Sequence, residues 1–267
     1  MQYWENSVKL FEHAIEVTHK KYPSFVGIYN NLGVVLNQQM KFEEAMVHLK
    51  NAVKLQPTFS ESHNNLGNSL SGLNRFREAN IYYQEAIRLN PNYPEAHNNL
   101  ANSLSKKLRL DEAIIHYKKA IQLKPEYYEA HFNFGVTLNK WNRSEQAIGY
   151  LEEAIRLNPN FTKARLSLGN ILRQKYKFKT AIHHFQTIIK MNPNHAIAHN
   201  SLGSALAEQG NFEQAIVHFH TSITINPRYL EAHQNLGTLF LLLGQSEQSI
   251  VYFKIAKEIA INEKLKK

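Results

Sequence analysis

The chain has 267 residues, contains no cysteine and carries a formal net charge of +9 at pH 7. The lack of cysteine excludes a disulfide framework and a thiolate metal site, and it suits a reducing compartment. No stretch approaches the roughly 18 consecutive apolar residues of a membrane-spanning helix, and the first ten residues show neither a basic leader nor an apolar run. We therefore predict a soluble, cytoplasmic protein without a membrane partner.

The first predicted element is a helix within residues 1–25. Its small and apolar residues, from Trp4 to Ala14, follow the spacing of the later stretch 42–52, and Pro23 closes it. That proline comes about one helical turn later than the spacing requires, so this helix should be longer than its later counterparts. We predict that residues 1–25 form a partial repeat with a second helix only, either as a cap or as the remainder of a longer array.

From Val26 to Ile261 the sequence repeats every 34 residues. In the copy from Ser60 to Tyr93, apolar or small residues recur at intervals of three and four in two stretches, which predicts two helices joined by a short turn. Proline ends the second helix, because the residue before a proline avoids the α conformation. Small residues recur in both helices and should let them approach closely. The first-helix positions are Gly33, Gly67, Ala101, Gly135, Gly169, Gly203 and Gly237, and the second-helix positions are Ala45, Ala79, Ala113, Ala147, Ala181, Ala215 and Ser249.

This 34-residue pattern resembles the tetratricopeptide repeat family. The resemblance covers seven units in residues 26–261 and leaves residues 262–267 as a basic tail. It implies an all-α fold, a right-handed superhelical solenoid of antiparallel helix pairs whose first helices line a concave groove. In such an array each unit contacts only its neighbours, so we expect no single central core.

Asparagine recurs at the positions that the resemblance assigns to the groove, although asparagine is a mediocre helix former. Because each amide offers two donors and an acceptor, a column of asparagines could bond the backbone of an extended peptide. The arrangement is similar to the asparagine ladder of the superhelical arm of O-linked N-acetylglucosamine transferases. The alternative is that these amides bond across helices or to water. The predicted peptide-binding residues are Asn31, Asn64, Asn65, Asn68, Asn98, Asn99, Asn102, Asn133, Asn170 and Asn235.

The fifth unit is basic, since no acidic residue occurs between Glu153 and Glu208. The resemblance places some of its cations in the groove and others at the turn on the edge of the groove. Such a patch would attract an acidic segment or a phosphate-bearing partner, and the alternative is a solvated basic turn. The predicted acidic-partner patch comprises Lys163, Arg165, Arg173, Lys175 and Lys177.

The last unit has Leu241 and Leu242 where earlier units have polar residues such as Asn139 and Lys140. A terminal repeat normally shows water a polar face. Either the tail 261–267 folds back over the leucines, or another subunit or domain docks there.

Catalytic and metal-binding motifs are not evident in the sequence. Five histidines share the fourth position of their units, and neighbouring copies should lie roughly 8–10 Å apart, too far to share a metal ion. There is no glycine-rich phosphate loop, nucleophile elbow or pair of carboxylates in a plausible pocket. We therefore expect no enzymatic activity, no cofactor and no bound metal. The five residues are His63, His97, His131, His199 and His233.

These observations predict a scaffold that binds an extended or helical peptide segment of another protein in its concave groove. One alternative is a non-catalytic substrate-recognition arm of a larger enzyme such as a glycosyltransferase. A weaker alternative is RNA binding through the basic patch, although the groove lacks the interleaved aromatic residues that stack on bases. We expect a protein or peptide partner that is acidic, no nucleic acid, and either a homo-oligomer or a partner docked on the C-terminal repeat.

Overall fold

The computed structural model describes residues 7–13, 26–106 and 109–264, and all of its regular secondary structure there is helical. Residues 7–13 are helical, while most of the predicted N-terminal partial repeat, including Trp4, Ala14 and Pro23, lies outside the described residues. The chain divides into two compact units, Met1–Thr137 and Leu138–Lys267, with the boundary inside helix α8.

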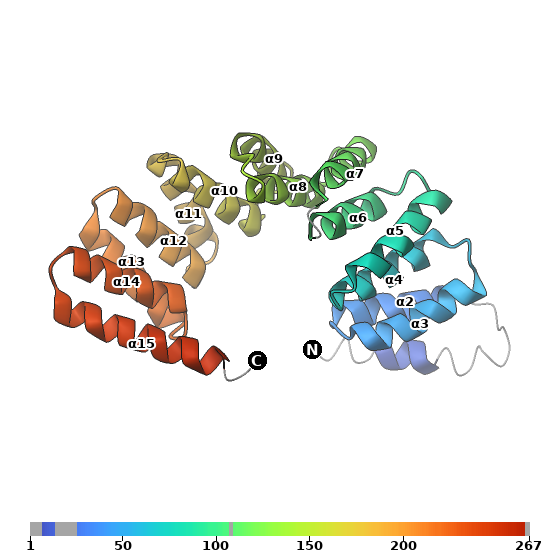
Figure 1. The fold of residues 1–267 in the computed structure, drawn as a ribbon, viewed down its shortest axis with the longest axis horizontal. Helices are drawn as coiled ribbons and strands as arrows, with labels where there is room; N and C mark the ends of the chain where they lie inside the picture. The colour runs from blue at the N-terminus through green and yellow to red at the C-terminus, as the bar shows by residue number, and fades with distance from the viewer. Residues whose placement is uncertain (1–6, 14–25, 107–108, 265–267) are drawn as a thin grey trace. The chain divides into compact units, whose positions relative to one another are not determined.

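Between Val26 and Lys264, in the residues that the structure describes, seven helix pairs follow one another (Figure 1). The first helix of each pair has 13 residues, and the second has 14 except in the last pair, where it has 19. The helices are α2 (Val26–Gln38), α3 (Phe42–Leu55), α4 (Ser60–Gly72), α5 (Phe76–Leu89), α6 (Pro94–Lys106), α7 (Leu110–Leu123), α8 (Tyr128–Lys140), α9 (Ser144–Leu157), α10 (Thr162–Gln174), α11 (Phe178–Met191), α12 (Ala196–Glu208), α13 (Phe212–Ile225), α14 (Leu230–Leu242) and α15 (Ser246–Lys264).

A tight turn ends the first helix of a pair and reverses the chain. In α4 the N–H of Arg75 donates to the carbonyl of Leu70 at 2.8 Å, and the N–H of Asn74 donates to Ser71 at 3.0 Å. This pattern satisfies carbonyls that a helix end otherwise leaves open, and it needs one residue with positive φ. The residues with positive φ fall at the same place in successive units: Met40, Asn74, Asn142, Tyr176, Gly210 and Gly244.

The small residues in the first helices are required by packing, as the sequence predicts. A Cβ atom at Gly67 would lie 2.5 Å from Cε1 of Tyr83, and one at Gly203 would lie 2.8 Å from Cε1 of Phe219. Real Cβ atoms do not approach carbon so closely, so the aromatic ring of the second helix occupies the space that glycine leaves. Tyr83 and Phe219 are almost completely buried as a result.

Helices contact only near neighbours within the described part of the chain. Each contact joins consecutive helices or the first helices of consecutive pairs, such as α4 with α6 and α12 with α14. The predicted all-α solenoid of antiparallel helix pairs, without a single central core, is confirmed. Among the described residues no helix has both the length and the apolar content needed to cross a membrane.

The division into residues 1–25, 26–261 and 262–267 stays a prediction. Helix α15 continues to Lys264, three residues into the stretch predicted as a basic tail. Residues 261–264 therefore extend the helix and do not fold back, and residues 265–267 lie outside the described residues.

Candidate functional site

Asparagine amides of successive first helices bond to one another in the unit Met1–Thr137. Asn65 Nδ2 donates to Asn30 Oδ1 at 3.0 Å, and Asn99 Nδ2 donates to Asn64 Oδ1 at the same distance. Asn133 Nδ2 continues the series by donating to Asn98 Oδ1 at 3.2 Å. The acceptors Asn30, Asn64 and Asn98 are buried, whereas the donors are half-buried. We call this series the amide ladder.

The amide ladder is the cross-helix bonding that the alternative interpretation of these asparagines describes. The amide ladder does not use every donor of these amides. The Nδ2 atoms of Asn65 and Asn133 each have two N–H groups, and each makes one ladder bond to the first helix of the preceding pair. The Asn65 oxygen receives only a long contact of 3.4 Å from Asn64. The half-buried donors therefore keep hydrogen-bonding capacity, and their role in binding a peptide stays a prediction.

The asparagines at the ninth position have a second structural role. Tyr83 OH donates to Asn68 Oδ1 at 2.9 Å, and Tyr117 OH donates to Asn102 Oδ1 at 2.6 Å. Burial raises the pKa of Tyr117 to about 12, so its hydroxyl remains a neutral donor. The oxygen of Asn68 thus accepts from buried Tyr83 and from Asn99, and the oxygen of Asn102 accepts from buried Tyr117.

Helix α2 of the unit Met1–Thr137 carries two more asparagines of this kind, Asn31 and Asn37. Asn31 is exposed, and its oxygen receives a long contact of 3.4 Å from Asn30. Sequence reasoning missed Asn37, whose Nδ2 donates to the carbonyl of Asn65 at 3.1 Å and whose oxygen accepts from Ser69 at 2.8 Å. The repeat gives little signal at this position, because of the other six units only the fourth has asparagine there, Asn139.

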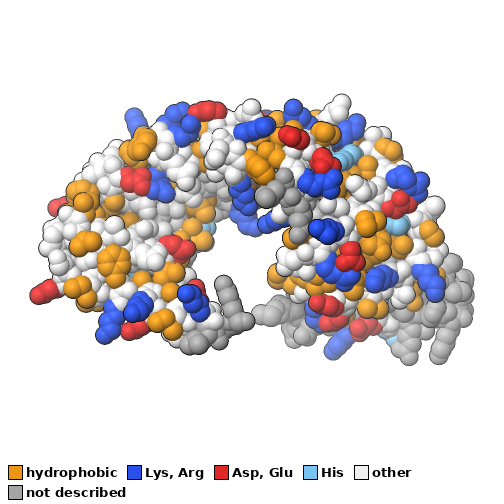
Figure 2. All heavy atoms as spheres, in the orientation of Figure 1, with side chains coloured by type: hydrophobic (Ala, Val, Ile, Leu, Met, Phe, Trp, Pro, Cys, Tyr) orange, Lys and Arg blue, Asp and Glu red, His pale blue; other side chains and the backbone are white. Residues whose placement is uncertain are grey.

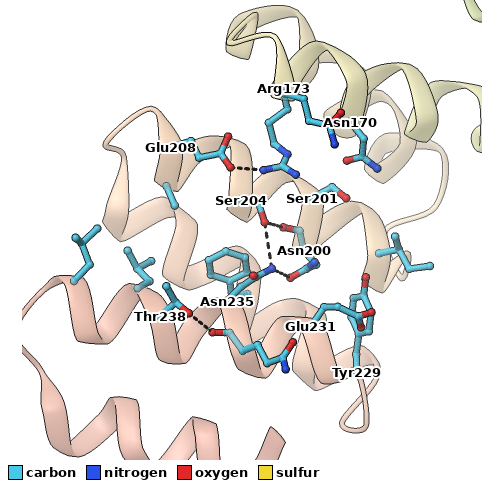
Figure 3. A pocket seen from close by; sticks show the side chains of 17 residues that line it. Asn170, Arg173, Asn200, Ser201, Ser204, Glu208, Tyr229, Glu231, Asn235 and Thr238 are labelled. Carbon is cyan, nitrogen blue, oxygen red and sulfur yellow. Dashed lines mark hydrogen bonds and ion pairs between the residues drawn. The ribbon is translucent and has the colours of Figure 1, made fainter. Parts of the chain in front are cut away.

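In the unit Leu138–Lys267 the first helices α10, α12 and α14 form a groove with a cavity volume of about 630 Å³. Asn235 Nδ2 donates to Asn200 Oδ1 at 3.0 Å and to Ser204 Oγ at 3.3 Å, so the amide ladder recurs here (Figure 3). Asn170 and Arg173 on α10 form one wall, and Figure 3 shows both side chains directed toward α12. We call this cavity the α10–α14 groove.

Charged and apolar residues also line the α10–α14 groove. Its acidic residues are Glu208 and Glu231, and Arg173 is its one cation among the described residues. Tyr229 lies beside Glu231, away from Arg173 (Figure 3). Amides, hydroxyls, one cation and apolar side chains together are suited to hold a polypeptide segment, which presents both backbone and side-chain groups.

Three of the five residues of the predicted basic patch bond to other groups of the chain. Arg165 Nη2 donates to the carbonyl of Pro159 at 2.9 Å, and Arg173 pairs with Glu208 on α12. Lys175 Nζ lies 2.5 Å from a carboxylate oxygen of Glu145 on α9. Adjacent helix pairs therefore supply the carboxylates that the stretch between Glu153 and Glu208 lacks. Lys163 and Lys177 are exposed.

The repeated histidines are packed in place and bond to the backbone. Their Nε2 atoms lie 2.8–3.2 Å from the carbonyl of the proline six residues earlier, in all five copies. Arg165 occupies the same position of its unit and bonds to the equivalent carbonyl. Among the described residues no group of three or more potential metal-ligating side chains converges.

Sequence reasoning missed two histidine pairs because they form within a helix pair and not between copies. The Nδ1 atoms of His97 and His116 are 2.9 Å apart, and those of His199 and His218 are 3.0 Å apart. Burial lowers the pKa of His97, His116 and His218, so these imidazoles favour the neutral form.

The C-terminal end presents apolar side chains to solvent. Leu241 is 57% exposed and Leu242 is 70% exposed, and Leu242 also lines the rim of the α10–α14 groove. Phe253 is 38% exposed, whereas its counterpart Phe219, one unit earlier, is 1% exposed. Hydrophobic side chains reach the surface over α14 and α15 in Figure 2. The described part of the tail does not cover the leucines, so the expectation that it folds back over them is not met there.

Comparison with protein families gives matches along most of the chain. Tetratricopeptide repeat models match residues 27–59, 60–93, 94–127, 116–149 and 196–229, which together exceed half of the sequence. None of the curated proteins matches closely enough to serve as a relative.

Solved structures with the same fold are numerous. YrrB, a TPR protein with an unusual peptide-binding site, is 26% identical with a TM-score of 0.57, over 69% of this chain and 95% of that one. MamA is 26% identical with a TM-score of 0.56, over 63% of this chain and 98% of that one. The APC/C hetero-tetramer Cut9–Hcn1 contains a chain that is 18% identical with a TM-score of 0.72, and the match covers 97% of this chain and 50% of that one.

Proposed function

The chain belongs to the tetratricopeptide repeat family, and we propose that it is a scaffold that binds a segment of another protein along its first helices. The observation that carries the proposal is the α10–α14 groove, where the amide ladder meets a cavity of about 630 Å³. YrrB, with its peptide-binding site, supports the proposal as a relative of the same family and similar fold.

The hydrogen bonds of the amide ladder would favour peptide binding because they hold its asparagine side chains in one rotamer before the peptide arrives. Asn99 bonds to both Asn64 and Asn68 at 3.0 Å, so its rotamer is set before any ligand arrives. Each rotamer-rich side chain that a ligand must immobilise costs roughly 0.5–1.5 kcal/mol, and pre-ordering removes part of that cost. Donors and acceptors that remain on Asn65 and Asn133 would bond the backbone of the segment. This mode of binding requires no catalytic residue, and we propose no enzymatic activity.

The other functions raised by the sequence depend on the same surfaces. If the chain is the recognition arm of a larger enzyme, its groove would hold the substrate. RNA binding through the basic patch loses support, because Arg165 and Lys175 are engaged by other groups of the chain.

A peptide-selection experiment tests the proposed function. Random 12-residue peptides would be selected on phage against the whole chain, and the affinity of the best peptide would be measured by fluorescence anisotropy. The variant Asn170→Ala/Asn235→Ala should weaken binding by about tenfold, as expected from the loss of one or two hydrogen bonds. The control Asn92→Ala/Asn160→Ala removes two exposed asparagines outside the groove and should bind as wild type does. Equal loss in both variants, or no selected peptide, would contradict the proposal.

The apolar end of the last pair supports a second proposal, that a partner helix stacks on α14 and α15. Phe219 is covered in its unit by the following pair, and the greater exposure of Phe253 marks the equivalent surface as uncovered. A cavity of about 540 Å³ lined by Phe253, Ala256 and Ala260 occupies this surface. An amphipathic helix with the small and apolar face of the chain's own first helices fits this place.

Analytical ultracentrifugation would separate a helix of another protein from a second copy of this chain as the occupant. Wild-type chain that remains monomeric favours the partner helix, whereas a dimer that Ala260→Glu dissociates assigns the surface to self-association.

A further inference from the structure

The pairing of Arg173 with Glu208 differs from the other arginine–glutamate pairs in the described part of the chain. Four such pairs are bidentate, with Nε and Nη2 of the arginine each bound to one carboxylate oxygen; they are Arg75–Glu78, Arg88–Glu85, Arg109–Glu112 and Arg156–Glu153. These four join residues three apart on the protein surface. Arg173 binds Glu208 through Nη1 only, and the pair joins α10 to α12.

Arg173 therefore binds Glu208 through one N–H donor, although a guanidinium can bind a carboxylate through two. Its Nε–H is buried and has no hydrogen-bond partner. A buried donor without a partner destabilises the folded chain, and a bidentate carboxylate would satisfy more of the guanidinium than Glu208 does. Glu208 is 43% exposed in its side chain, so it would return to water at little cost when it leaves.

The Arg173–Glu208 pair lies where a bound peptide could reach it. Arg173 and Glu208 both line the α10–α14 groove, and Figure 3 shows the guanidinium above Ser204 with Asn170 next to it. Glu231 lies at the other side of the groove with Tyr229, so an acidic ligand group would be repelled there and attracted at Arg173.

We propose that Arg173 binds a carboxylate of the peptide and that Glu208 occupies its place when the groove is empty. This inference rests on the proposed function, because it names the class of segment that the groove selects. The ligand is a segment with an aspartate or glutamate side chain at the α10 wall. Glu208 is then an internal competitor, and removing its charge should strengthen binding.

The test uses two selections of random 12-residue peptides on phage, one against the wild-type chain and one against Arg173→Gln. The wild-type chain should select peptides enriched in aspartate or glutamate at one position, and Arg173→Gln should select peptides without that enrichment. If neither chain selects any peptide, the proposed function itself fails. If both chains select peptides with the same acidic enrichment, or neither shows it, only the inference about Arg173 is overturned.

A gain in affinity keeps the proposal testable even if Arg173→Gln does not fold. An acidic peptide selected by the wild-type chain should bind Glu208→Gln about tenfold more tightly, since the competitor has lost its charge. The control Glu213→Gln removes the same charge from an exposed site on α13 and should leave the affinity within twofold. An unchanged or weaker affinity in Glu208→Gln would overturn the proposal, as would a gain of equal size in Glu213→Gln.

A lysine at position 173 distinguishes bidentate hydrogen bonding from attraction by positive charge alone. Arg173→Lys keeps the charge but presents it as a point, so it should bind the acidic peptide several-fold more weakly than wild type. Full affinity in Arg173→Lys would show that bidentate pairing is not involved.

Discussion

Substitution of Gly67 by alanine tests whether the helices of a pair approach as closely as the structure describes. The added Cβ would lie 2.5 Å from Cε1 of Tyr83. The ring cannot simply swing away, because Tyr83 is 2% exposed and its hydroxyl is bonded to Asn68. Overpacking of this kind costs roughly 1–3 kcal/mol, and we expect the upper end because a rigid ring must move. Alanine also favours a helix over glycine by about 1 kcal/mol, which leaves a net loss of about 2 kcal/mol.

Gly149 on α9 is the matched control. Nothing lies within 4 Å of a Cβ atom built there, so Gly149→Ala should gain the helix preference alone, about 0.5–1 kcal/mol. Urea unfolding followed by circular dichroism would compare the two variants with wild type, and amide exchange would show whether the loss is confined to α4, α5 and their neighbours. A Gly67→Ala chain as stable as wild type, beside a stabilised Gly149→Ala chain, would refute the packing argument.

Three further predictions concern stability. Burial lowers the pKa of His184 to about 4, so this histidine stabilises the folded chain above pH 6.5 and that contribution is lost as pH falls toward 4. The urea midpoint should therefore fall over this range and fall less in His184→Phe; an identical pH profile in the variant would count against the argument. Arg165→His should keep wild-type stability, because histidine bonds the equivalent proline carbonyl in other units, whereas Arg165→Ala should lose about 1 kcal/mol; equal urea midpoints of the two variants would contradict this. Leu241→Glu/Leu242→Glu should change stability by less than about 0.5 kcal/mol, since both side chains are exposed, and a large loss in urea unfolding would show that the tail covers them.

The fold could be predicted from the sequence because the same local signals recur in each unit. The small residue at Gly67 and the proline at Pro91 fix a close helix pair and its end, and their repetition at 34-residue intervals fixes the stacking. Each signal alone is weak, but agreement between packing, turn and helix end in every copy favours one structure.

The site was less predictable because stacking creates neighbours that are distant in the sequence. Asn65 bonds to Asn30 and Arg173 pairs with Glu208, and each pair is 35 residues apart. A search for acidic residues close in sequence to Arg173 therefore missed its partner. The pairing of His97 with His116 was missed for a related reason, since side-chain directions within a helix pair decide it and residue spacing does not.

The most direct test of peptide binding by the first helices is to map where a bound peptide touches the chain. A peptide selected on phage would carry benzoylphenylalanine at successive positions, and cross-links would be located by mass spectrometry. We predict cross-links to residues of α10, α12 and α14 that line the groove, such as Asn170, Ser201 and Gln234. Cross-links confined to the second helices α11, α13 and α15 would contradict the central claim that the first helices form the binding surface.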